Sequence, residues 1–172
     1  MSEEYKRIYT FGMDYGTSDF KFGSIACGEK PEIVENRGYF PDKDSIVFRT
    51  FETSREIVVG KDVPLYLQAS EDLSQRLVYP MRNGVVERDD ERAWNVVQEI
   101  SKYGLEAFKP SEKFEGFYVV ASLSSVSPRY MYEKVFEICQ RLDQTERLVK
   151  AATIIPQPLA VAIAHKVTTC VV

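Results

Sequence analysis

The stretch that decides the fold of this chain is FGMDYGTSDFKFG, residues 11–23. Apolar residues dominate on both sides of its centre, from Ile8 to Met13 and from Phe20 to Ala26, which is typical of two short strands. Gly16 lies between them and can take the positive φ that a tight hairpin turn requires. The stretch therefore predicts a β-hairpin with polar residues gathered at its turn.

These polar residues are of the types that bind phosphate and a hydrated cation. Successive N–H groups in such a turn attract anions, and Thr17, Ser18 and Lys21 add two hydroxyls and a positive charge. Asp14, at the end of an apolar strand, is placed to hold Mg²⁺ through its water ligands. The same pattern also fits a surface turn with a solvated lysine, and the sequence has no Gly-x-x-x-x-Gly-Lys-Ser/Thr motif. The hairpin alone leaves both interpretations open.

The composition of the whole chain fits one globular domain. Its 172 residues are 44% hydrophobic and 28% charged, which allows a sizeable core. A formal net charge of −4, with no basic stripe, argues against a nucleic-acid partner. Cys27, Cys139 and Cys170 lie in apolar stretches without metal-ligand spacing, which predicts buried thiols in a reducing compartment. With no signal peptide and no apolar run of transmembrane length, we expect a cytoplasmic protein without a membrane span.

Beyond the hairpin, the hydrophobic patterns predict a meander of strands, an insertion, and then alternating helices and strands. Strands are expected at residues 31–38, 57–60, 117–123, 148–155 and 167–172, and helices at 65–77, from Asp89 or Asp90 to Phe108, from Ser127 through Leu142, and from Leu159 to Lys166. Ser127 is expected to cap its helix, with Pro128 in the first helical position. This order of elements is typical of a mixed α/β sheet.

The element order, with the first hairpin as a phosphate loop, resembles the ribonuclease H-like half of the actin, Hsp70 and sugar-kinase ATPases. Four segments resemble actins in particular: residues 14–21 (DYGTSDFK), 58–62 (VVGKD), 77–86 (LVYPMRNGVV) with Asp89, Asp90 and Trp94 after it, and 155–164 (IPQPLAVAIA). The third is the most specific, since Hsp70 and sugar kinases lack it. The YTFG opening and the PQPLAVAIA run are similar to the crenactins, the filament-forming actins of archaea.

The resemblance implies an α/β fold, a ribonuclease H-like (actin-like ATPase) domain with a mixed five-stranded sheet flanked by helices and a small inserted lobe. It divides the chain into residues 1–38 and 61–166 as the body of the domain (like actin subdomain 1), 39–60 as the inserted lobe (like subdomain 2), and 167–172 as the first strand of a second half. The polar residues 52–56 are a candidate contact surface on the lobe. The resemblance covers this whole chain but less than half of an actin, so we expect an N-terminal half.

The resemblance also implies roles for individual residues. Those expected to bind the phosphates of ATP or ADP are Gly16, Thr17, Ser18, Phe20 and Lys21. Asp14 is expected to hold Mg²⁺ through water, and Gln157 to orient the attacking water, so these two form the expected catalytic pair. Without the resemblance, Gln157 between two prolines is only a helix-start residue.

The expected function is that of an actin-like cytoskeletal protein that binds ATP·Mg²⁺, hydrolyses ATP through a water positioned by Gln157, and assembles into filaments. Expected partners are further copies, a complementary chain that supplies the second half, and regulators of the actin-binding type. We expect this half alone to be inactive. Two alternatives stay open: half of a sugar or metabolite kinase, and a non-catalytic interaction module with the actin fold.

Overall fold

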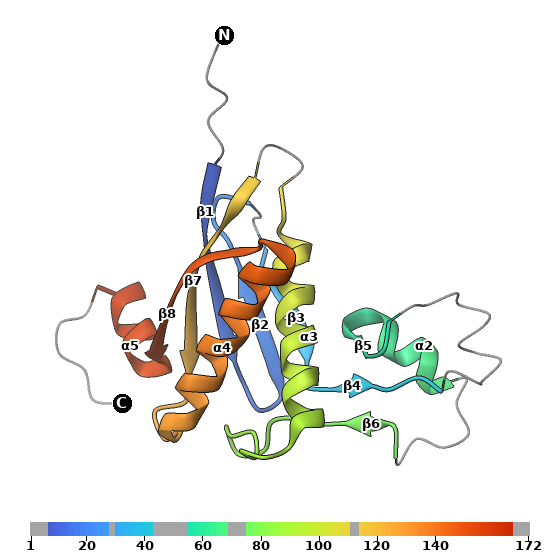
Figure 1. Cartoon of the computed structure of the whole chain (residues 1–172). Helices are drawn as coiled ribbons and strands as arrows, with labels where there is room; N and C mark the ends of the chain where they lie inside the picture. Colours follow the sequence, from blue (N-terminus) through green and yellow to red (C-terminus); the bar gives the residue numbers. More distant parts are fainter. Residues whose placement is uncertain (1–6, 28–29, 43–54, 69–74, 111–113, 167–172) are drawn as a thin grey trace, which may run out of the picture.

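The structure is a computed structural model that describes residues 7–27, 30–42, 55–68, 75–110 and 114–166. The expected strand at 167–172, with Cys170, and most of the polar segment 52–56 lie outside these residues. The described chain forms a larger unit around a five-stranded sheet and a smaller unit around a three-stranded sheet (Figure 1).

The larger sheet has the strand order β3-β2-β1-β7-β8. Its strands are β1 (Arg7–Tyr15), β2 (Asp19–Gly23), β3 (Glu32–Glu35), β7 (Phe114–Leu123) and β8 (Val149–Pro156). The first three form an antiparallel meander, whereas β7 pairs parallel to β1 and β8 pairs parallel to β7. Parallel strands need a crossover, and helices supply it here. The expected mixed five-stranded sheet is confirmed.

Two long helices, α3 (Glu91–Ala107) and α4 (Arg129–Glu146), cover one face of this sheet, and a shorter helix, α5 (Gln157–Ala164), follows β8 (Figure 1). Helix α3 begins where the sequence predicts, because the Asp90 side chain caps it by accepting a hydrogen bond from the Ala93 amide. Among the residues that the structure describes, no helix is long and apolar enough to cross a membrane.

The predicted cap of α4 is wrong. Pro128 is its N-cap residue, the helix begins at Arg129, and no side chain caps it. The Ser127 hydroxyl instead donates to the Gly84 carbonyl at 3.3 Å. This hydroxyl therefore ties the start of α4 to a distant turn and does not serve the first turn of its own helix.

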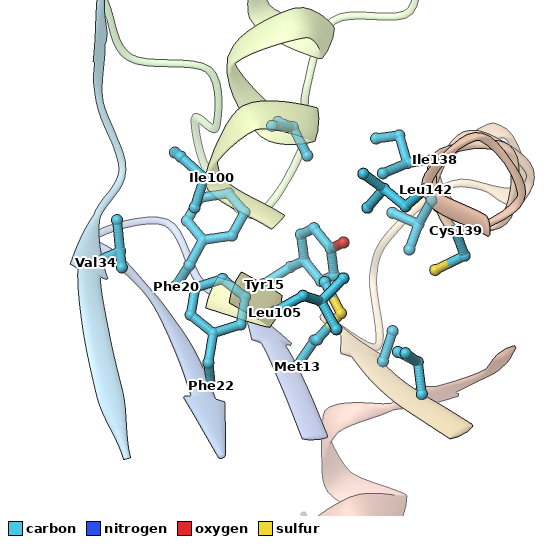
Figure 2. Close-up of a cluster of buried hydrophobic side chains, with 14 of the residues drawn as sticks. Met13, Tyr15, Phe20, Phe22, Val34, Ile100, Leu105, Ile138, Cys139 and Leu142 are labelled. Carbon is cyan, nitrogen blue, oxygen red and sulfur yellow. The ribbon is translucent and has the colours of Figure 1, made fainter. Parts of the chain in front are cut away.

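The core fills the space between the sheet and the two long helices (Figure 2). Side chains alternate along a strand, so Phe11, Met13 and Tyr15 of β1 all face this side. The Tyr15 hydroxyl and the Ser101 hydroxyl are hydrogen-bonded at 2.9 Å within the core. Burial raises the pKa of the Tyr15 hydroxyl, and it raises the pKa of the Cys139 thiol to about 11. Cys139 is buried, as predicted, whereas Cys27 is only partly buried, so the prediction of a buried thiol is wrong there.

The opposite face of the sheet is open in the described part of the chain. Ile8, Tyr118 and Val120 lie on it with 39%, 50% and 36% of their surfaces exposed. Asp14 shares this face, because it alternates with the buried residues of β1. The polar edge described below therefore opens on the uncovered side of the sheet.

The smaller unit is a three-stranded sheet with its own small core. Its strands are β4 (Gly38–Tyr39), β5 (Val58–Val59) and β6 (Leu77–Val78), joined by the 3-10 turn η1 (Gly60–Asp62) and the helix α2 (Val63–Gln68). Tyr39, Val58, Val63 and Tyr66 are buried together. β6 is paired with β4, and Leu67 of α2 and Leu77 of β6 pack against this small core. The division of the chain at residue 60 stays a prediction.

Gly104 of α3 gives a stability test of the core. A Cβ there would lie 2.5 Å from Cγ of Phe22, which is itself buried. Helix propensity alone favours alanine over glycine by about 1 kcal/mol, but overpacking a core costs about 1–3 kcal/mol. We expect Gly104→Ala to lower the free energy of unfolding, measured by chemical denaturation. Gly23→Ala, with open space around its Cβ, is the matched control, and a stabilised Gly104→Ala would contradict the packing.

Candidate functional site

Three strands end at one edge of the larger sheet and bring three polar side chains together. β1, β7 and β8 run parallel, and the register places Asp14 opposite Ser122 and Ser122 opposite Ile155. Gln157 follows two residues later as the first residue of α5. Ligands of open α/β sheets bind outside the carboxyl ends of the strands. This edge is therefore the candidate site.

Asp14 is the centre of the site. Its Oδ1 accepts two hydrogen bonds, from the Ser122 hydroxyl at 2.6 Å and from the Gln157 amide nitrogen at 2.8 Å. Its Oδ2 lies 3.7 Å from Nζ of Lys21, and both side chains are partly exposed, 33% for Asp14 and 51% for Lys21. Oδ1 is thus hydrogen-bonded within the protein, whereas Oδ2 lies near the partly exposed ammonium group of Lys21.

The orientation of the Gln157 amide follows from its partners. Its Nε2 lies 2.8 Å from the Asp14 carboxylate and 3.4 Å from the Tyr15 carbonyl, and neither oxygen can donate a hydrogen bond. The NH₂ group must therefore face them, which leaves Oε1 to accept a hydrogen bond from a water. Pro158, in the first turn of α5, costs no helical bond because an N–H there has no intrahelical partner.

The turn between β1 and β2 differs from its prediction in one respect. The described glycines with positive φ are Gly60, Gly84 and Gly116, and Gly16 is not among them. A Cβ on Gly16 would lie 2.5 Å from the Asp19 carbonyl oxygen, so this position needs glycine for space and not for its φ angle.

The other predicted phosphate-binding residues divide between the site and the core. Thr17 and Ser18 are exposed at the turn, and Lys21 is exposed on β2. The Phe20 side chain is fully buried and packs edge-on against Tyr15, with ring centroids 5.2 Å apart. Its side chain therefore belongs to the core and does not reach the edge where Asp14, Thr17 and Ser18 lie.

A second turn packs beside the hairpin and is held by it. Asn83 and Gly84 both have positive φ, and Arg82 and Val85 exchange two backbone hydrogen bonds, at 2.8 and 3.0 Å. This pattern is the two-residue hairpin that Asn-Gly favours, so the predicted Asn-Gly turn is confirmed. The Gly84 amide donates to the Thr17 hydroxyl at 2.7 Å. The Thr17 hydroxyl therefore accepts a hydrogen bond from the protein, and its own O–H can donate a hydrogen bond to a ligand.

Asn36 joins the two turns, and the sequence did not predict its role. Its side-chain nitrogen donates to the carbonyls of Thr17 (2.5 Å) and Met81 (2.7 Å), and its side-chain oxygen accepts from the Met81 amide (3.1 Å). Its backbone amide donates to the Ser18 carbonyl at 2.9 Å. An asparagine after a strand is an ordinary turn residue, so no local signal distinguishes it.

Ser122 is the other residue that the sequence analysis missed. A polar residue near the end of the apolar segment 117–123 was the available signal, because a carboxyl-terminal strand end is where sites form in such sheets. Among the described residues, no group of three His, Cys, Asp or Glu side chains could hold a metal directly. The free Oδ2 of Asp14 fits a cation held through its waters, which is a common way for proteins to hold Mg²⁺.

Comparison with solved structures places this geometry in a known fold. A non-polymerising MamK mutant bound to AMPPNP matches 94% of the chain with a TM-score of 0.73 at 19% identity. A MamK double helical filament matches 93% with a TM-score of 0.71 at 18% identity. This chain has the actin-like ATPase fold. MreB 5 of Spiroplasma citri, bound to AMPPNP, matches 95% with a TM-score of 0.60 at 15% identity.

The chain spans less than half the length of the structures it matches: 45% and 44% of the two MamK chains and 43% of the MreB chain. A scan against protein-family models finds no match. At these identities the likeness concerns the fold, and the roles of individual residues rest on the geometry above.

The Asn36 contacts give a test of the turn architecture. Asn36→Ala removes three side-chain hydrogen bonds and leaves the Met81 amide without this partner, and each buried group left unpaired costs about 1–3 kcal/mol. We expect the free energy of unfolding to fall by about 2–4 kcal/mol, together with faster amide exchange at Gly84. Arg82→Ala, at an exposed position without a positive φ beside the same turn, serves as a comparison and should leave both measurements unchanged. Unchanged exchange at Gly84 would contradict the link between the turns.

Proposed function

We propose that this chain supplies the first phosphate-binding half of an actin-like protein that binds ATP·Mg²⁺ and assembles into cytoskeletal filaments. The observation that carries the proposal is the shared use of Asp14 Oδ1 by Ser122 and Gln157, beside a hairpin turn with exposed hydroxyls. Two of the similar structures are bound to AMPPNP, and one is a double helical filament. These findings support nucleotide binding and self-assembly as the function.

In this proposal the residues at this edge of the sheet divide the binding of phosphate and cation between them. The amides of Gly16, Thr17 and Ser18, with the two hydroxyls, bind the β- and γ-phosphates of ATP or ADP, and Lys21 adds its charge. Mg²⁺, when bound, neutralises the negative charge of the phosphates. Asp14 Oδ2 would hold that ion through its water ligands.

Gln157 acts on the attacking water. Its amide nitrogen donates to Asp14 and Tyr15, so its Oε1 can accept a hydrogen bond from that water and orient it. Phosphoryl transfer depends mostly on positioning and on charge neutralisation, so a neutral amide is sufficient for this role. Asp14 thus serves both the cation and the orientation of Gln157.

The finer features of the function are also proposals. We propose a crenactin-type archaeal actin of the cytoplasm, partnered by further copies of itself, by regulators of the actin-binding type and by a complementary polypeptide. That polypeptide supplies the second half of the nucleotide site, including the adenine pocket. We expect turnover to require it, because the described residues contact only the phosphate end of a nucleotide in this proposal.

The first experiment measures ATP·Mg²⁺ binding and sedimentation of the chain, alone and mixed with a separately expressed second half of a crenactin-type actin. We expect weak binding by the chain alone, and tight binding with pelleted polymer in the mixture. No binding and no polymer in either sample would instead favour a non-catalytic interaction module. ATP binding without polymer, with phosphate transferred to an added sugar in a parallel assay, would favour half of a metabolite kinase.

The phosphate-loop assignment predicts the effect of two substitutions. Asp14→Ala and Lys21→Ala should each weaken ATP·Mg²⁺ binding by about tenfold or more, about 1.4 kcal/mol, in titration calorimetry of the mixture. Lys30→Ala removes an exposed lysine outside the hairpin and should leave the affinity unchanged. Wild-type affinity in both Asp14→Ala and Lys21→Ala would remove the hairpin from the site.

The role of Gln157 predicts a separation of binding from turnover. Gln157→Ala should leave ATP·Mg²⁺ affinity within about twofold and slow phosphate release by roughly 10²-fold, the effect of losing a positioned water. The rate is measured as single-turnover hydrolysis in the mixture. Gln140→Ala, on the exposed side of α4, is the control. A wild-type rate in Gln157→Ala would exclude this residue from catalysis.

A further inference from the structure

We propose that Ser122 is the positioning residue of the site: its hydroxyl orients the Asp14 carboxylate so that Oδ2, and not Oδ1, faces the cation. This inference rests on the proposed function. Ser122 comes from β7, far from the phosphate-binding hairpin in sequence, and none of the expectations drawn from the sequence gave it a role.

The sheet fixes the backbone of Ser122 on both sides. Ser122 lies on β7 and is paired with Asp14 on β1 and with Ile155 on β8. Its side chain is only 8% exposed. The hydroxyl is therefore held by the sheet at a fixed distance from Asp14, whereas Gln157 reaches Asp14 from the start of α5, a helix with no buried residue.

The partner of Ser122 distinguishes it from other buried serines. Among the described residues, Ser24 donates to the Thr10 carbonyl and Ser101 to the Val97 carbonyl, which are ordinary ways to satisfy a buried hydroxyl. Ser122 donates to a side-chain carboxylate at 2.6 Å. Such charge-assisted hydrogen bonds are short and stronger than neutral ones.

The Ser122 hydroxyl determines which oxygen of Asp14 is used within the protein and which one is left to face a ligand. With Ser122 and Gln157 both on Oδ1, the carboxylate presents Oδ2 to solvent and to Lys21 at 3.7 Å. Without the hydroxyl, the carboxylate can rotate about its terminal torsion, which is soft, and Oδ2 is no longer held in one direction. The water ligands of the cation would lose a fixed acceptor, and Gln157 would lose the fixed acceptor for its amide.

The test compares ATP binding with and without magnesium. Ser122→Ala should weaken binding of ATP·Mg²⁺ by about tenfold to a hundredfold, the size expected for a hydrogen bond to a charged group, and leave binding of ATP in EDTA unchanged. Ser122→Thr keeps the hydroxyl on a strand-favouring side chain and should restore the affinity. Thr153→Ala removes an exposed hydroxyl from the same sheet and should have no effect. Equal weakening with and without magnesium would overturn the inference.

Asp14→Asn provides the internal check. In that background Ser122→Ala should cause no further loss, because the hydroxyl acts through the carboxylate. If Asp14→Asn weakens ATP·Mg²⁺ binding and Ser122→Ala does not, the positioning role is wrong and the proposed function stands. Fully additive losses would also overturn the positioning role, since they would mean that Ser122 acts independently of Asp14.

A measurement without ligand further separates the positioning role of Ser122 from the proposed nucleotide-binding function. The side-chain amide signals of Gln157 in a ¹H–¹⁵N spectrum should shift in Ser122→Ala and return in Ser122→Thr. If they shift but the wild-type chain binds no ATP, alone or in the mixture, the positioning role stands and the proposed function fails. Unshifted Gln157 signals in Ser122→Ala would overturn the inference.

Discussion

A single oxygen atom, Asp14 Oδ1, connects the carboxyl ends of three strands. It accepts hydrogen bonds from Ser122 near the end of β7 and from Gln157 just after β8, while Asp14 is the last residue but one of β1. Parallel pairing brings these strand ends to the same edge, and the sharing of one oxygen leaves the other free. The chemistry proposed for the site depends on these two roles of the Asp14 carboxylate: Oδ1 binds Ser122 and Gln157, and Oδ2 faces the ligand.

A second set of contacts places the hairpin turn next to that carboxylate. Asn36 and the Gly84 amide hold Thr17 from two sides, through its carbonyl and its hydroxyl. Asn36 lies just before β4 and Met81 lies shortly after β6, so the two chain segments that lead into and out of the smaller unit meet at the turn. The turn proposed to bind phosphate is therefore hydrogen-bonded to both of the segments that carry the smaller unit.

The sequence predicted the parts of this fold that depend on local patterns. The alternation of Phe11, Met13 and Tyr15 and the capping by Asp90 are readable within a few residues, so β1 and α3 were expected correctly. The contacts of Ser122 with Asp14 and of Asn36 with Met81 join residues 108 and 45 positions apart, which no local pattern encodes. Asp14 and Gln157 became a pair only through resemblance to actins, and the structure shows the hydrogen bond that joins them.

The most direct test of the site is a ¹H–¹⁵N titration of this chain with AMPPNP and Mg²⁺, carried to millimolar concentration. A nucleotide phosphate site at the strand ends predicts shifts that concentrate at the amides of Gly16, Thr17, Ser18 and Gly84 and at the side-chain amide of Gln157. Removal of Mg²⁺ with EDTA should reduce them. Shifts confined to the smaller unit, or none at millimolar nucleotide, would contradict a phosphate site at Asp14.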